Sequence, residues 1–112
     1  AILIGHMSLR KNKYNAKKTD VDGITFDSKR ESRRYLELKM LLQAGHISDL
    51  ELQIPFPCVV NGKKICSYKA DFAYTQDGER VVEDVKGFVT RDFRLKKKLV
   101  EALYGIEVVI VK

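Results

Sequence analysis

The sequence predicts an α/β domain of the α+β type, with helices flanking a mixed central sheet. Two segments with helical spacing of apolar residues, about 28–44 and 91–104, enclose a region of alternating polar and apolar residues. Within that region Asp77-Gly78 separates two runs rich in aromatic and β-branched residues, which is typical of a β-hairpin. A continuous apolar run over 106–111 is consistent with a buried strand. The expected order is α-β-β-β-α-β.

The length of the chain, 112 residues, is sufficient for one domain with its own core. We expect residues 1–18 to be a tag remnant followed by a flexible basic arm, because Gly5-His6-Met7 resembles a cloning scar and the segment after it has almost no apolar residues. Residues 19–112 would then form the single folded domain. No apolar run approaches the roughly 18 residues that cross a membrane. A soluble, cytoplasmic protein is expected.

The charge balance favours a polyanionic partner. Lys and Arg number 21 against 15 Asp and Glu, which gives a net charge of +6. Basic arms such as the one holding Lys11 and Lys13 commonly contact phosphates, although a solubilising tail fits equally well. Cys58 and Cys66 match no zinc-site spacing, and we expect both to be reduced thiols.

The first predicted helix, about 28–44, begins with a capping-box pattern in which Ser28 is the N-cap and Glu31 the third helical residue. Its apolar residues share one stripe: Tyr35, Leu38, Leu41 and Leu42. Because Glu31 falls on the same stripe, it either completes the capping box or places a carboxylate at the core-facing end of the helix. Arg30 and Arg34 flank the stripe and are available for phosphate or for solvent.

The segment after this helix predicts strands. Residues 50–56 alternate as a half-buried strand, and we expect its pairing to loosen or end at Pro55 and Pro57 because proline cannot donate to a ladder. Asn61-Gly62 is expected to lie between strands 56–60 and 65–70. The core face of the following hairpin is expected to carry Tyr68, Ala70, Phe72, Tyr74, Val81 and Val85.

The Asp77-Gly78 turn sets a register in which Asp71 faces Asp84. Like charges at such positions, with Cβ atoms about 4.5–5.5 Å apart, are destabilising unless something compensates them. Strand parity places Lys86 on the side of Asp84 and Glu83 on the opposite side. A divalent cation would compensate the pair, and Mg²⁺ usually takes only one or two protein carboxylates. The alternative is an exposed hairpin edge whose charges are simply solvated.

The second predicted helix, about 91–104, starts after Thr90 as N-cap. Its broad apolar side would consist of Phe93, Leu95, Leu99, Val100, Ala102, Leu103 and Tyr104. Arg94, Lys97, Lys98 and Glu101 would point away from that side. Lys96 projects from the apolar side, where it either snorkels to solvent or reaches a phosphate at the end of the sheet.

A helix glutamate, an aspartate and an Asp-x-Lys at the end of the next strand, within this element order, resemble the PD-(D/E)XK nuclease superfamily and its restriction-endonuclease-like fold. The segments Ser-Lys-Arg-Glu-Ser-Arg-Arg-Tyr, Leu-Glu-Leu-Gln and Val-Glu-Asp-Val-Lys-Gly are similar to those of a small, phage-encoded and largely uncharacterised group within it. The similarity covers residues 14–111. The sequence departs from the commonest pattern in having Asp84 before x-Lys and Ala70 before Asp71.

The resemblance implies that Asp71 and Asp84 bind Mg²⁺ or Mn²⁺ and that Lys86 positions or polarises the attacking water. Glu31 would be a further metal ligand or would hold a water of the metal. Gln53 resembles a strand glutamine of some relatives. The implied activity is hydrolysis of DNA phosphodiester bonds by a metal-dependent endonuclease. Its DNA contacts are expected at Arg30, Arg34, Arg91, Lys96, Lys97, Lys11 and Lys13.

A domain of this size has little surface for reading base sequence, which requires side chains that reach into a groove from a dedicated element. We therefore expect selectivity for branched DNA such as Holliday junctions, as in the junction resolvases that the sequence resembles. A homodimer is expected, because symmetric resolution needs two sites related by a two-fold axis. The rival interpretation is a non-enzymatic module that binds double-stranded nucleic acid, since a double-stranded RNA-binding domain also runs α-β-β-β-α.

Overall fold

The structure is a computed structural model that describes residues 2–3 and 18–112. The elements in chain order are β1 (Ile2–Leu3), β2 (Thr19–Val21), β3 (Ile24–Phe26), α1 (Lys29–Gln43), β4 (Ser48–Val60), β5 (Lys63–Gln76), β6 (Glu79–Val85), α2 (Arg91–Tyr104) and β7 (Val108–Val111). From α1 to β7 they follow the predicted α-β-β-β-α-β order. The α+β fold class is confirmed.

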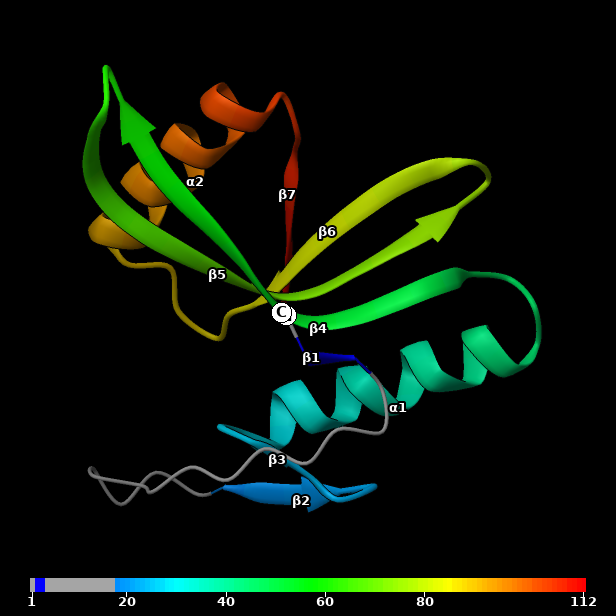
Figure 1. Ribbon diagram of the computed structural model, residues 1–112. Helices are drawn as coiled ribbons and strands as arrows, with labels where there is room; N and C mark the ends of the chain where they lie inside the picture. Colours follow the sequence, from blue (N-terminus) through cyan, green and yellow to red (C-terminus); the bar gives the residue numbers. More distant parts are fainter. Residues whose placement is uncertain (1, 4–17) are drawn as a thin grey trace.

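The main sheet has the strand order β1-β4-β5-β6-β7, in which only β6 and β7 pair in parallel. The helices α1 and α2 lie on opposite sides of this mixed sheet, and the separate β2–β3 hairpin lies against α1 (Figure 1). Each face of the sheet therefore has its own apolar core. One core lies between the sheet and α1, and the other lies between the sheet and α2.

The predicted hairpin register is confirmed. Asp77 and Gly78 have φ angles of 51° and 78°, as a two-residue type I′ turn requires at both central positions. Gln76 pairs with Glu79, and the pairing continues to Phe72 opposite Glu83. The next residues outward on the two strands are Asp71 and Asp84. The turn chemistry thus brings the two aspartates together.

The caps of both helices also agree with the sequence. Ser28 Oγ accepts a hydrogen bond from the Glu31 backbone N–H at 3.1 Å, and Thr90 Oγ1 accepts one from that of Phe93 at 3.1 Å. Along α1 the buried residues are Ser32, Tyr35 and Leu38. The predicted apolar stripe of α1 is correct.

The predicted broad apolar side of α2 is wrong. Phe93 and Val100 are buried, but Leu95 is 69% exposed. Two positions along an α-helix correspond to a rotation of about 200°, so a helix that buries Phe93 must turn Leu95 toward solvent. Lys97 does not point away as expected, because its amino group pairs with Glu101 at 2.8 Å and both side chains are largely covered.

The apolar side chains of β5 do not all lie on the one face that the sequence predicted. Phe72 and Tyr74 pack in the core beside α1, as do Val81 and Val85, but Tyr68 and Ala70 pack in the core beside α2. The alternation of side chains is interrupted at Asp71 and at the residue across from it on β4, Gln53, whose φ is +54°. A left-handed backbone at a non-glycine residue costs about 1–3 kcal/mol and bends the strand away from regular pleating.

The prediction that pairing loosens or ends at Pro55 and Pro57 is wrong for the side of β4 that faces β5, since both lie inside β4 and pair with Lys69 and Ser67 across the ladder. On its other side β4 pairs only with β1, at Glu51 and Leu52. Within the described residues β4 is therefore an edge strand beyond Leu52, and prolines whose nitrogens face an open edge cost no ladder hydrogen bond.

Two further expectations concern the chain ends and the cysteines. Ile2–Leu3, expected to belong to a tag remnant, form β1, whereas Lys11, Lys13 and most of the basic arm lie outside the described residues. Cys58 and Cys66 face each other across the β4–β5 hairpin, and both are free thiols as predicted. No helix in residues 2–3 and 18–112 has the length and apolar character of a membrane span.

Candidate functional site

The centre of the site is a pair of acidic side chains on neighbouring strands. Asp84 is 2% exposed, and Asp71 lies beside it, one residue beyond the Phe72–Glu83 pair of the ladder. Asp71 Oδ2 accepts a hydrogen bond from the Val85 backbone N–H at 2.8 Å. Asp84 Oδ2 accepts one from the hydroxyl of Tyr68. Both carboxyl groups are thereby fixed in orientation.

The electrostatics of the pair are unfavourable to two negative charges. Burial, together with the neighbouring Asp71 carboxylate, raises the pKa of Asp84 to about 8. Burial and the nearby Glu31 carboxylate raise the pKa of Asp71 to about 6. Near neutral pH, double ionisation of the pair is therefore favoured only when a positive charge compensates it. A buried and a half-buried carboxylate on neighbouring strands provide the hard oxygen donors that suit Mg²⁺ or Mn²⁺.

Glu31 lies at the first turn of α1, beside this pair. The sequence left open whether it caps the helix or extends the acidic site. Its backbone N–H donates to Ser28 Oγ, while its carboxylate is close enough to Asp71 to raise the pKa of that group. Within residues 2–3 and 18–112, however, no three carboxylate, imidazole or thiol groups form a ready-made metal cluster. The donor set that fits a cation is the pair, and Mg²⁺ characteristically completes such a set with water.

Lys86 is the cation of the site. Its Nζ lies 3.8 Å from Asp84 Oδ1 and 4.9 Å from the centre of the Phe93 ring. Its backbone N–H donates to the Val111 carbonyl at 2.9 Å, which ties the end of β6 to β7. The side chain is 36% exposed, and its ammonium group lies over the face of the Phe93 ring as a cation–π contact.

A cleft of about 300 Å³ gives access to this end of the sheet. It is lined by Ser67, Tyr68, Lys69, Asp84, Lys86, Thr90, Asp92, Phe93 and Lys96. Lys96, which the sequence placed either in solvent or near a phosphate, lies on the rim of this cleft. The cleft therefore combines the buried carboxyl group of Asp84 and the exposed one of Asp92 with three lysines.

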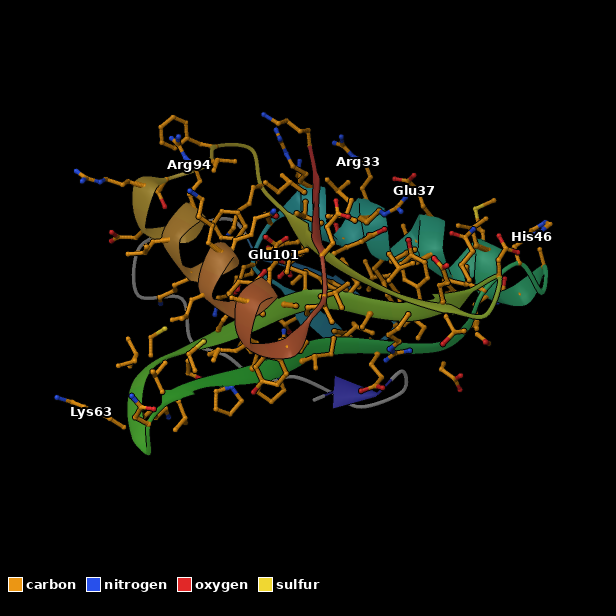
Figure 2. All side chains as sticks on the ribbon, turned by 90° about the horizontal axis from the view of Figure 1, so that it is seen from above. Arg33, Glu37, His46, Lys63, Arg94 and Glu101 are labelled. Carbon is orange, nitrogen blue, oxygen red and sulfur yellow. The ribbon has the colours of Figure 1, made fainter. Side chains whose placement is uncertain are left out.

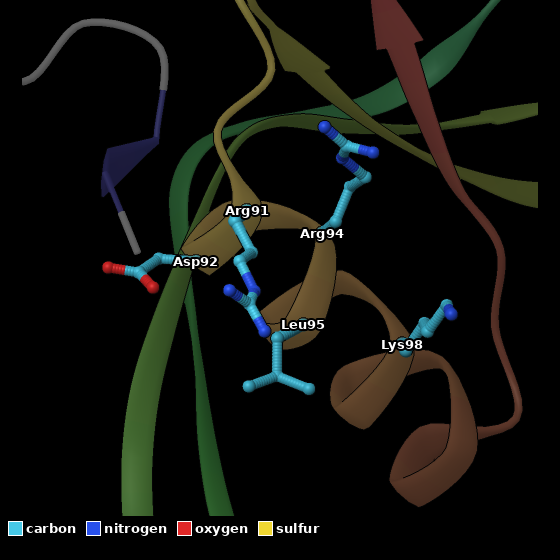
Figure 3. Close-up of a pocket in the computed structure, with 5 residues that line it drawn as sticks. All are labelled: Arg91, Asp92, Arg94, Leu95 and Lys98. Carbon is cyan, nitrogen blue, oxygen red and sulfur yellow. The ribbon is translucent and has the colours of Figure 1, made fainter.

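Basic side chains continue from the cleft across both helices. The guanidinium group of Arg30 lies so close to Gly87 that a Cβ atom there would come within 2.9 Å of Nη1. A larger pocket of about 500 Å³ is lined by Arg91, Asp92, Arg94, Leu95 and Lys98 at the start of α2 (Figure 3). Viewed from above, Arg33 of α1 and Arg94 of α2 point toward the same side of the molecule (Figure 2).

Two of the predicted phosphate contacts are engaged within the protein instead. Arg34 donates from Nε and Nη2 to the two carboxylate oxygens of Glu83, at 2.9 and 2.7 Å. Glu83 is 2% exposed and also accepts from the Tyr74 hydroxyl at 2.5 Å. The carboxylate raises the pKa of the Arg34 guanidinium. Lys97 is held by Glu101, whose Oε2 also accepts from the Val108 backbone N–H at 2.9 Å.

Arg34→Ala should therefore lower the free energy of unfolding by about 3 kcal/mol, because it leaves the Glu83 carboxylate buried without its cation. Urea denaturation measures the change. Arg33→Ala removes an exposed arginine from the same helix and should stay within about 0.5 kcal/mol of the parent protein. If the two variants are equally stable and only Arg34→Ala loses affinity for DNA, Arg34 is a phosphate contact and its ion pair with Glu83 does not stabilise the fold.

Sequence reasoning missed three residues of this region. Tyr68 was assigned to the opposite face from Asp84, and only the interruption at Gln53 brings its hydroxyl to the carboxyl group. Arg94 and Lys98 were expected merely to point away from the core, although their spacing from Arg91 along one helix face was a readable signal of a shared basic surface.

Comparison with known proteins adds a family but no activity. A family model described as "Protein of unknown function (DUF1064)" matches residues 11–110, a range that includes the whole candidate site. No curated protein matches the chain.

Proposed function

Since this chain belongs to the DUF1064 family, whose description assigns no function, we propose from its site that it is a metal-dependent DNA endonuclease. The observation that carries the proposal is the pair of the half-buried Asp71 and the buried Asp84, with the Lys86 ammonium 3.8 Å from Asp84. Its arrangement on one hairpin, with Glu31 on the preceding helix, is similar to the pattern of PD-(D/E)XK nucleases. The confirmed element order is consistent with the same superfamily.

The proposed roles follow from the positions of the side chains. Asp71 and Asp84 would hold Mg²⁺ or Mn²⁺, and the Val85 N–H and the Tyr68 hydroxyl orient their oxygens. The bound cation would neutralise charge that develops on a phosphodiester and would lower the pKa of water. Lys86, in the cleft beside Asp84, would position the attacking water and support the phosphate.

DNA is the polyanion that we propose as substrate. The cleft opens between Lys86 and Lys96, Arg30 lies beside Gly87, and Arg91 lies at the start of α2. Such a surface neutralises phosphates without reading bases, which favours recognition of DNA shape. We therefore propose selectivity for branched DNA and action as a homodimer, with one site for each of two symmetric strands.

The proposal is tested by cleavage of a labelled panel of linear duplex, single strand, flap, fork and four-way junction. We expect cutting with Mg²⁺ or Mn²⁺, none with EDTA, and faster cutting of the branched members. Light scattering gives the oligomeric state in the same buffer. Equal cutting of duplex and junction by a monomer would refute the branched-DNA and dimer proposals while leaving the nuclease in place.

The rival function, a non-enzymatic nucleic-acid-binding module, predicts a different outcome of the same panel. It would bind double-stranded nucleic acid equally well in EDTA and would cut nothing. Such a module gains nothing from the Asp71/Asp84 pair, because two carboxylates repel a phosphate backbone. Tight binding without cleavage in every metal would favour the module.

A further inference from the structure

The loop between β6 and α2 carries an exposed aromatic side chain next to the candidate site. Phe88 is 79% exposed, more than any other large apolar residue of the described chain. Single exposed apolar residues are common on protein surfaces. The position of Phe88 distinguishes it, because only Gly87 separates it from Lys86 and its Cα is therefore within about 7 Å of that of the lysine.

The loop holds Phe88 in place although the ring itself is exposed. At one end, the Lys86 backbone N–H is bonded to the Val111 carbonyl at 2.9 Å. At the other end, Val89 packs against the core beside α2, and Thr90 caps that helix. A short segment anchored at both ends presents a side chain at a defined place, so the outward direction of Phe88 is set by the fold.

The charges around this ring match a nucleic acid. The guanidinium group of Arg30 lies against Gly87, and Lys86 and Arg91 flank the loop in sequence. A partner that contacts both the apolar ring of Phe88 and the three cations must combine a flat apolar surface with negative charge. A nucleotide does so, because its base has a π-face and its phosphate is an anion.

We propose that Phe88 stacks on a nucleobase that has left the base stack beside the cleaved phosphate, and that it thereby selects DNA with unpaired or loosely stacked nucleotides. This proposal rests on the nuclease function and specifies its substrate class. An intact duplex keeps its bases stacked inside the helix and offers Phe88 no face, whereas flaps, forks and junctions expose bases at the point of branching.

The test uses binding and cleavage by four proteins: the parent, Phe88→Ala, Phe88→Trp and Met40→Ala. Met40 is a matched control because it is 69% exposed and lies on the last turns of α1, away from Glu31 at the other end of that helix. The DNA is a fork with 2-aminopurine at the branching nucleotide, whose fluorescence rises when the base leaves the stack. Binding is measured in EDTA, so this readout does not depend on cleavage.

We expect the parent and Met40→Ala to raise the fluorescence and Phe88→Ala to lose most of the rise. Phe88→Trp should keep the affinity of the parent for the fork, with a smaller rise because a stacked indole quenches 2-aminopurine. Phe88→Ala should bind and cut the fork about 5- to 100-fold less well, the range expected from loss of one base–aromatic stack, and should match the parent on intact duplex.

An unchanged fluorescence rise in Phe88→Ala, or an equal loss on fork and duplex, would overturn the proposal. The proposal would also be overturned if Phe88→Ala converted a dimer to a monomer and left the fluorescence rise unchanged. The ring would then contact a second copy of the chain. A parent protein that raises the fluorescence through Phe88 but cuts no DNA in any metal would refute the nuclease function and retain the base contact.

Discussion

Asp84→Asn is expected to lower the rate of DNA cleavage by about a thousandfold or more, because metal-ion catalysis contributes several kcal/mol of charge stabilisation. Asparagine keeps an oxygen that can accept the hydrogen bond of Tyr68, so the fold should persist. In the parent protein, Mg²⁺ at about 100 times its dissociation constant should add about 2.7 kcal/mol of stability. The corresponding rise in Tm, about 10 °C, should disappear in Asp84→Asn.

The control for this variant is Asp77→Asn, which makes the same chemical change in the exposed turn of the same hairpin. Asparagine is accepted at the first central position of a type I′ turn, so register and folding should be kept. Asp77→Asn should cut DNA and respond to Mg²⁺ like the parent. Cleavage that survives in Asp84→Asn would remove this carboxylate, and with it the proposed metal site, from the mechanism.

Lys86→Ala should reduce kcat by about 10²- to 10⁴-fold, the usual contribution of a side chain that positions or transfers a proton. The dissociation constant for DNA should change little, since other cations around the cleft still face the phosphates. Single-turnover cleavage and equilibrium binding separate the two quantities. Loss of the contact with the Phe93 ring should cost about 1 kcal/mol of stability at most.

Lys63→Ala is the matched control, because it removes an equal charge from the exposed start of β5, at the β4–β5 turn, and Lys63 does not line the cleft that holds Lys86. It should leave kcat unchanged. If Lys86→Ala weakens binding and leaves the rate of the bound complex unaltered, Lys86 is a phosphate contact and has no part in the chemical step.

Local patterns were enough to predict the fold class and the acidic pair. The Asp77-Gly78 turn sets the register by backbone conformation alone, and strand parity then places Lys86 beside Asp84. Ser28 and Thr90 marked both helix starts in the same way. Each of these features depends on residues that are close together in the sequence, where turn, cap and periodicity rules apply directly.

The features that could not be predicted depend on distant segments. The ion pair of Arg34 with Glu83 joins α1 to β6, and nothing near Arg34 in the sequence indicates that partner. Likewise, the hydroxyl of Tyr68 reaches Asp84 because Gln53, on another strand, adopts a left-handed backbone. Asparagine and glycine are common at positive φ and therefore indicate such conformations in a sequence, whereas glutamine is not.

The bend at Gln53 also has a geometric consequence for how such a protein can diverge. The acidic pair lies where the two apolar cores meet, close to the pivot about which the two halves of β4 and β5 change direction. A small change in the angle between the halves moves the outer ends of α1 and α2 most and the pivot least. Substitutions in either core can thus widen or narrow the spacing of the flanking basic groups while Asp71 and Asp84 keep their mutual distance.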